Sequence, residues 1–131
     1  MIFPYEKELG ERFGGVKYWH SCGNTTVFQE QIKKRPDLEL YHCGPWTDFA
    51  SAARIMSPGT AVDLCINPQK DVVEASPEEM EKKLRDIRAA GGAARYAVRA
   101  DAFMVTGAYD GSIMRKIGEW NRAARRVLSG R

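Results

Sequence analysis

The sequence predicts an α/β fold in which parallel strands alternate with helices, and three observations point to it. Four short apolar or β-branched runs are each followed by turn residues. A helical pattern follows each of these runs. The intervals between successive runs are long enough for a crossover helix, which parallel strands require and antiparallel hairpins do not. The chain of 131 residues has the size of one domain, so we expect residues 1–131 to form a single domain with a buried core.

The expected strands are short, and each ends where His, Cys, Asn or Arg residues begin to appear. In chain order they cover residues 16–20, 38–42, 60–66 and 95–98. An additional helix, over residues 4–13, precedes the first strand. The order of elements is therefore one helix followed by four strand-helix pairs.

The helix with the clearest signals begins after Ser76. Ser76 is a favourable N-cap, Pro77 suits the first helical position and Glu79 completes a capping box. A single apolar stripe follows at helical spacing: Met80, Leu84 and Ile87. Gly91 and Gly92 are expected to end this helix.

Three further helices follow from periodicity and stop signals. The last covers residues 112–128 and places a set of apolar residues on its inner face: Ile113, Ile117, Trp120, Ala124 and Val127. The other two cover residues 25–35, which Pro36 ends, and residues 47–56, which end before Pro58. The helices over residues 25–35 and 47–56 would each connect two strands, and the helix over residues 112–128 would follow the last strand.

The composition predicts a cytoplasmic protein that binds neither nucleic acid nor a membrane. A formal net charge of +3 is too small to indicate either kind of surface. The basic residues of the last helix are expected to form a solvated face: Arg115, Lys116, Arg122, Arg125 and Arg126. The sequence has no long apolar run, and its first residues lack the pattern of a signal peptide. Three cysteines without framework spacing fit a reducing compartment.

The number of strand-helix units predicts half of a TIM (β/α)8 barrel. A closed barrel of this type needs eight units over about 250 residues, and this chain has four units. The helix over residues 4–13 has no strand before it and so looks like the end of a missing unit. The alternative is a doubly wound four-stranded sheet, but no Gly-rich phosphate loop follows any strand.

The His and Cys residues all lie at the ends of expected strands, which is where strand-helix folds hold their reactive groups: His20, Cys22, His42, Cys43 and Cys65. His20 and Cys22 are two residues apart, so both can face one site. His42 and Cys43 are adjacent and therefore point to opposite faces. A His-x-Cys pair with a third, distant ligand fits a catalytic zinc site. The alternative is a small buried cysteine beside a hydrogen-bonded core histidine.

Other polar residues near the same strand ends are further candidates. Cys65 shares a strand face with Asp63, and we expect Asp63 to pair with an Arg or a Lys. Arg99 is expected either to pair with Asp101 or to face an anionic ligand. Asn24 follows the His-x-Cys pair, where it can also cap the next helix, and Asn24 and Arg99 are the candidate substrate-binding residues.

Several segments carry a recognisable pattern: Tyr5-Glu6-Lys7-Glu8-Leu9, Val16 through His20-Ser21-Cys22-Gly23-Asn24, Ala52-Ala53-Arg54-Ile55-Met56, Ile66-Asn67-Pro68, and the helix from Ser76-Pro77-Glu78-Glu79 to Ala89-Ala90-Gly91-Gly92. Together they resemble the C-terminal half of the uroporphyrinogen decarboxylase superfamily. The resemblance covers nearly the whole chain. It implies the same half of a TIM barrel that the count of strand-helix units predicts.

Within that superfamily, the motif from His20 to Asn24 is most similar to zinc-dependent methyltransferases that move a methyl group from a corrinoid to a thiol such as coenzyme M. The resemblance implies that His20 and Cys22 bind zinc and that a corrinoid is the methyl donor. In those enzymes a later Cys completes the ligands, at a place where this chain has Arg99-Ala100-Asp101. Cys65 or Asp101 would then be the third ligand.

The resemblance leaves three functions open. As a methyltransferase half, the chain would need an N-terminal half-barrel chain to complete its site, and a corrinoid protein as a partner. As a fragment of a tetrapyrrole decarboxylase, it would need no metal or cofactor. As a non-catalytic half-barrel, it would form a homo-oligomer that covers its open strand edges and apolar inner surface.

Overall fold

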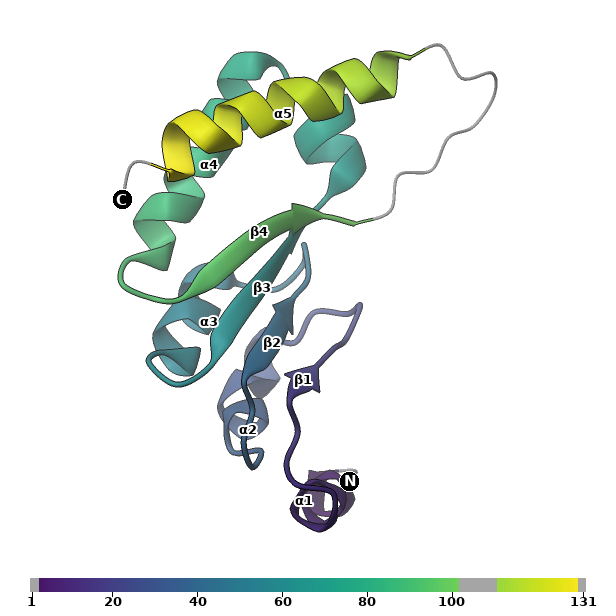
Figure 1. Cartoon of the computed structure of the whole chain (residues 1–131), viewed down its shortest axis with the longest axis vertical. Coiled ribbons are helices and arrows are strands. Elements are labelled where there is room, and N and C mark those ends of the chain that lie inside the picture. The colour runs from purple at the N-terminus through teal and green to yellow at the C-terminus, as the bar shows by residue number, and fades with distance from the viewer. Residues whose placement is uncertain (1–2, 102–110, 130–131) are drawn as a thin grey trace. The chain divides into compact units, whose positions relative to one another are not determined.

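The computed structural model describes residues 3–101 and 111–129 (Figure 1). The chain divides into two compact units, Met1–Cys65 with Gly91–Arg99, and Ile66–Ala90 with Ala100–Arg131. The expectation of a single domain stays a prediction. In the part of the chain that is described, no helix has the length and apolarity needed to cross a membrane.

A four-stranded parallel sheet confirms the predicted α/β class. Its strands are β1 (Tyr18–Trp19), β2 (Leu40–Cys43), β3 (Ala61–Ile66) and β4 (Tyr96–Ala100). β1 and β2 pair in parallel with Tyr18 opposite Leu40, and β2 and β3 pair in parallel with His42 opposite Asp63. A backbone hydrogen bond from Val62 N to Arg95 O, at 2.9 Å, joins β3 to the start of β4.

The strands lie side by side in the order in which they occur in the chain, β1-β2-β3-β4 (Figure 1). A doubly wound sheet reverses its strand order at a switch point, where its ligand binds. The described sheet has no such reversal. Its order is that of consecutive strands in a barrel, so the sheet is compatible with half of one.

One face of the sheet in the first unit is apolar and covered by helices. Tyr41 and Val62 lie opposite each other on neighbouring strands and are fully buried, as is Cys43 two residues along. Helix α3 (Phe49–Met56) contacts β2, and helix α2 (Gln29–Lys33) contacts α3. Because side chains alternate along a strand, the residues between these apolar positions lie on the opposite face.

Two helices of the first unit begin later than the sequence predicts. The expected helix over residues 25–35 is a 3₁₀ turn, Thr26–Phe28, followed by the short α2. Helix α3 begins at Phe49 because Asp48 is its N-cap, with Asp48 Oδ1 accepting from Ser51 N at 3.1 Å. The first helix, α1 (Phe3–Arg12), confirms the prediction for residues 4–13, and its Glu6 pairs with the buried Arg35.

In the second unit, helix α4 (Pro77–Gly91) has the predicted capping box. Ser76 N donates to Glu79 Oε2 at 2.7 Å, and Glu79 N donates to Ser76 Oγ at 3.2 Å. The predicted stripe is buried: Met80, Leu84 and Ile87. Sequence reasoning therefore located this helix, its cap and its buried face.

Helix α5 (Ser112–Leu128) matches its predicted range, but its predicted inner face is only partly buried. Trp120 and Ala123 are buried, whereas the other four residues predicted for the inner face are half-buried: Ile113, Ile117, Ala124 and Val127. Helix α5 contacts a single π-helical turn, η2 (Gln69–Val73). The hydrogen bond from Lys116 Nζ to Ala75 O, at 2.7 Å, shows that the basic face of α5 is not entirely solvated.

Candidate functional site

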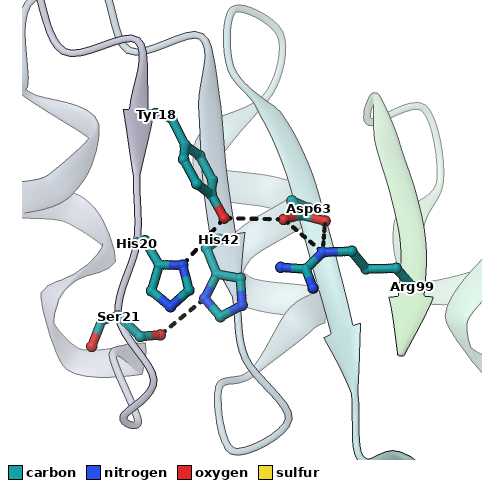
Figure 2. Close-up of polar contacts among 6 residues, drawn as sticks. All are labelled: Tyr18, His20, Ser21, His42, Asp63 and Arg99. Atoms are coloured by element: carbon teal, nitrogen blue, oxygen red, sulfur yellow. Dashed lines mark hydrogen bonds and ion pairs between the residues drawn. The ribbon is translucent and has the colours of Figure 1, made fainter. Parts of the chain in front are cut away.

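The sheet face opposite α2 and α3 carries a line of polar side chains (Figure 2). Tyr18 lies on β1, and His20 follows two residues later, so the two side chains share a face. His42 on β2 and Asp63 on β3 are opposite each other in the register. Arg99 on β4 reaches Asp63. All four strands therefore contribute to one cluster on this face, and His20 lies just beyond the carboxyl end of β1.

Asp63 and Arg99 form the charged end of this cluster. Arg99 Nε donates to Asp63 Oδ1 at 2.9 Å and to Oδ2 at 3.1 Å. The hydrogen bond to Asp63 raises the pKa of Arg99 above its ordinary value. The predicted pairing of Asp63 with a basic residue is confirmed, and the partner is Arg99.

Tyr18 connects this ion pair to His20. Its hydroxyl donates to Asp63 Oδ2 at 3.3 Å and lies 3.3 Å from His20 Nδ1. Burial, together with the Asp63 charge, raises the pKa of Tyr18, so the phenol keeps its proton. Since that proton is donated to Asp63, the phenol oxygen accepts from the N–H of His20 Nδ1.

This arrangement fixes the tautomer of His20. With its proton on Nδ1, a neutral His20 has a lone pair on Nε2. His20 Nε2 lies 3.3 Å from Cys22 Sγ, within hydrogen-bonding distance of the thiol. The cluster is thus a continuous chain of hydrogen bonds from Arg99 to the exposed Cys22.

His42 packs directly against His20. The two rings are stacked, with centroids 4.1 Å apart and planes at 3°. His42 Nδ1 donates to Ser21 O at 2.9 Å, which leaves the lone pair on Nε2. Burial lowers the pKa of His42, so this ring is neutral at neutral pH. Its Nε2 is buried and has no hydrogen-bond partner among the described residues.

The loop that carries Cys22 is held in place by buried threonines. Thr47 Oγ1 donates to Gly23 O at 3.3 Å and accepts from Thr25 N at 3.1 Å. Thr25 Oγ1 also lies 2.6 Å from the hydroxyl of the buried Tyr41. These bonds tie the turn after β1 to β2 and its following loop, which keeps Cys22 next to His20.

The three cysteines lie in different environments. Cys22 is exposed, whereas Cys43 and Cys65 are buried. Burial raises the pKa of Cys43 to about 12, so Cys43 stays a thiol at neutral pH. The alternative of a small buried cysteine in the His-x-Cys motif is therefore wrong.

His20 and Cys22 could bind one zinc ion together, but the described residues do not provide a complete zinc site. A tetrahedral zinc binds a His nitrogen at about 2.0 Å and a Cys sulfur at about 2.3 Å, which places the two ligand atoms about 3.5 Å apart. The observed distance between His20 Nε2 and Cys22 Sγ is close to this value. Yet the described residues contain no group of three His, Cys, Asp or Glu side chains that could hold a metal ion. His42 does not supply the third ligand, because an imidazole binds a metal in its ring plane and two stacked rings have separate planes.

The remaining predicted site residues lie as follows. Asn24 is exposed, and its Oδ1 accepts from Thr26 N at 3.0 Å, so its side chain supports the turn before the 3₁₀ helix. Cys65 is buried, and Asp101 is exposed and belongs to the second unit. The substrate-binding role of Asn24 and Arg99 and the third-ligand role of Cys65 or Asp101 stay predictions.

Sequence reasoning did not include Tyr18 and His42 in the site. Tyr18 could have been found, since its spacing of two residues from His20 on the same strand predicts a shared face. His42 was set aside because it is adjacent to Cys43. The parallel register places His42 on the same face as Asp63, so the pairing of strands decides its role.

No protein-family model matches the chain, and no curated protein matches it in sequence. Function is therefore inferred from the geometry of the cluster and from the motifs that surround His20 and Cys22.

Proposed function

We propose that the chain is the C-terminal half of a uroporphyrinogen decarboxylase-like (β/α)8 barrel and forms half of a site that transfers a methyl group from a corrinoid to a thiol. The observation that carries the proposal is the approach of His20 Nε2 to Cys22 Sγ, at 3.3 Å, beside the carboxyl ends of parallel strands. The strand order without reversal supports the half-barrel. The motif His20-Ser21-Cys22-Gly23-Asn24 supports the choice of reaction.

Within this proposal, Asp63 and Tyr18 orient the ring of His20 through hydrogen bonds. Asp63 pairs with Arg99 and accepts from Tyr18, which in turn accepts from His20. This order directs the lone pair of His20 Nε2 toward Cys22. A bound zinc would supply Lewis-acid chemistry at this pair, but its remaining protein ligand would come from outside the described cluster.

The partners in this proposal would supply groups that the described cluster does not contain. A separate N-terminal half-barrel chain would add the other strands and the missing ligand, and a corrinoid protein would deliver the methyl group. Such an assembly would also cover β1 and β4, the two edges of the sheet.

The test measures bound zinc and methyl transfer in the same preparations. The purified chain, alone and mixed with the N-terminal half of a uroporphyrinogen decarboxylase-like barrel, is analysed for zinc by mass spectrometry. It is then supplied with methylcobalamin and a small thiol. We expect one zinc per completed site and a methylated thiol, both lost in Cys22→Ala and retained in Glu30→Ala, which alters an exposed residue of α2. Folded protein that neither binds stoichiometric zinc nor methylates a thiol would rule out this function.

A second candidate is a non-catalytic half-barrel that associates with itself. Large apolar side chains on α1, immediately after it and on β1 are exposed in the first unit: Tyr5, Leu9, Phe13 and Tyr18. Clusters of this kind on a protein surface mark sites of association. A folded oligomer without zinc or methyl transfer would favour this candidate over the first.

A further inference from the structure

We propose that the exposed face of α5 binds the phosphate backbone of double-stranded DNA without reading its sequence. Every residue of this face belongs to the second unit, whereas His20 and Cys22 belong to the first, so the inference goes beyond the proposed function and does not depend on it. The α5 face consists of the six exposed residues of this helix: Met114, Arg115, Asn121, Arg122, Arg125 and Arg126. Four of the six are arginines, and none is acidic.

Three of these arginines carry charge that no described residue neutralises. Arg126 pairs with Glu81 of α4, and Lys116 pairs with Glu119, the one acidic residue of α5, at 3.8 Å. The remaining three form no ion pair or side-chain hydrogen bond with the described residues: Arg115, Arg122 and Arg125. Their charges are therefore available to an anion from another molecule.

The helix places these three charges in a row. Arg115 and Arg122 are seven residues apart, which is about two turns, so they lie on the same side of α5 and about 10 Å apart along its axis. Arg125 comes three residues after Arg122 and is its neighbour on the helix surface. Like charges at this spacing destabilise a helix, and phosphates lying alongside would relieve their repulsion.

The uncharged residues of α5 favour DNA over an anionic membrane or an acidic protein. A helix that binds a membrane surface inserts its apolar face there, but Trp120 and Ala123 of α5 are already buried. Protein interfaces are centred on large apolar side chains, and the α5 face offers only Met114. Interfaces with DNA are polar and strongly positive, as this face is.

The duplex is favoured over a single strand for a related reason. Proteins that bind single strands stack the unpaired bases on exposed aromatic side chains. Trp120 is the one aromatic residue of α5, and it is buried. The face therefore offers positive charge without a stacking platform, which matches the closely spaced phosphates of a duplex.

The charge of the whole chain hides this feature. The composition predicts no binding to nucleic acid because the net charge is only +3. Helix α5 alone has five basic residues and one acidic residue, a net charge of +4, so the rest of the chain lowers the total. Binding through phosphates depends on the local charge of the face that meets them.

The first experiment measures binding of the unaltered chain to short fluorescein-labelled DNA duplexes by fluorescence anisotropy. A protein that neutralises three phosphates should show a slope of about −2.7 in log K against log salt, which is a loss of about 40-fold between about 50 mM and about 200 mM salt. Two duplexes of unrelated sequence should bind equally, because phosphate contacts carry no sequence information. No binding at the lower salt concentration, or binding to only one of the duplexes, would overturn the proposal.

The second experiment removes the row of unpaired charges. The triple variant Arg115→Gln, Arg122→Gln, Arg125→Gln should bind the duplex about 10-fold more weakly or worse at the lower salt concentration, and its binding should depend little on salt. Circular dichroism checks that the variant is folded. Unchanged affinity in the folded variant would overturn the proposal.

A matched control makes the same change in net charge away from α5. It replaces three exposed arginines of the first unit: Arg12→Gln, Arg54→Gln and Arg95→Gln. We expect this variant to keep the affinity of the unaltered chain. An equal loss in the two triple variants would show that net charge rather than the α5 face drives binding, which would overturn the proposal.

Two further measurements use the unaltered chain and so do not depend on a variant that folds. Adding the duplex should shift the amide NMR signals of α5 more than those of other residues, and shifts centred outside residues 112–128 would contradict the assignment. Affinity for the duplex should also exceed affinity for a single strand, for vesicles of phosphatidylserine and phosphatidylcholine, and for a polyglutamate peptide. Tighter binding to any of these three would overturn the proposal in favour of that class of partner.

Discussion

His42 is a buried histidine that is neutral in the folded chain, and this state couples stability to pH. Burial lowers its pKa below the ordinary value of 6.5. In the unfolded chain the same ring takes up a proton near that ordinary value. The unfolded state therefore binds more protons than the folded state as the pH falls below about 6.5, and the free energy of unfolding decreases with it.

We predict that the urea midpoint of the chain falls between neutral pH and about pH 5, partly because of His42. The stability that neutral His42 contributes is fully present above the pKa of this ring in the unfolded chain. It is lost as the pH falls toward the lower pKa of His42 in the folded chain. In His42→Gln the midpoint should depend less on pH, whereas Val27→Ser, which alters an exposed residue without a titratable group, should keep the full dependence. An NMR titration of the unaltered chain that gave His42 a pKa at or above its ordinary value would contradict this account.

The residues of the site were only partly predictable. The spacing of His20 and Cys22 identified the candidate pair, because residues two positions apart in an extended segment face the same way. In the structure both residues follow β1. The pairing of Asp63 with Arg99 joins residues 36 positions apart and depends on β4 lying beside β3. Local spacing suggested Asp101 as the partner of Arg99, since strand neighbours cannot be read from one strand alone.

At the level of elements, α4 was predicted most completely because its signals are local. Its capping box, its buried stripe and its glycine end all lie within the helix or next to it. The short elements were predicted less well. In β1 only Tyr18 and Trp19 pair with β2, so the strand is shorter than the predicted one over residues 16–20. The start of α3 moved to Phe49 because Asp48 is a better cap than Thr47, whose hydroxyl is used by Thr25 and Gly23.

The cap of α4 gives a prediction for the second unit. Ser76→Ala removes the oxygen that accepts from Glu79 N, so the first turn of the helix loses one of its hydrogen bonds. We expect the free energy of unfolding to fall by about 1 kcal/mol, measured by urea denaturation followed by circular dichroism. Ser129→Ala, at the exposed C-terminal end of α5, is the matched control and should leave the stability unchanged. A loss in Ser129→Ala as large as in Ser76→Ala would show that the cap is not the cause.

For the whole molecule, the order of the strands limits what the chain can form. The sheet has two edges, at β1 and β4, and the order β1-β2-β3-β4 has no switch point at which a doubly wound sheet would bind its ligand. The sequence predicted the number of strands, because each has its own apolar run. The order of the strands in the sheet was predicted only from the number of strand-helix units and from the family resemblance, because which strands become neighbours depends on tertiary packing.

The β1 edge predicts self-association of the chain. In the first unit, a cleft of about 450 Å³ between α1 and β1 is lined by Leu9 and Phe13, which are 54% and 76% exposed. An open strand edge beside exposed apolar side chains favours pairing with another chain. We expect sedimentation equilibrium to show a dimer or larger species, and the double variant Leu9→Ser with Phe13→Ser to shift it toward monomer. Val27→Ser removes an apolar side chain that is 81% exposed elsewhere in the unit and should leave the distribution unchanged. A folded chain that stays monomeric at every concentration would contradict the prediction that the β1 edge associates with another chain.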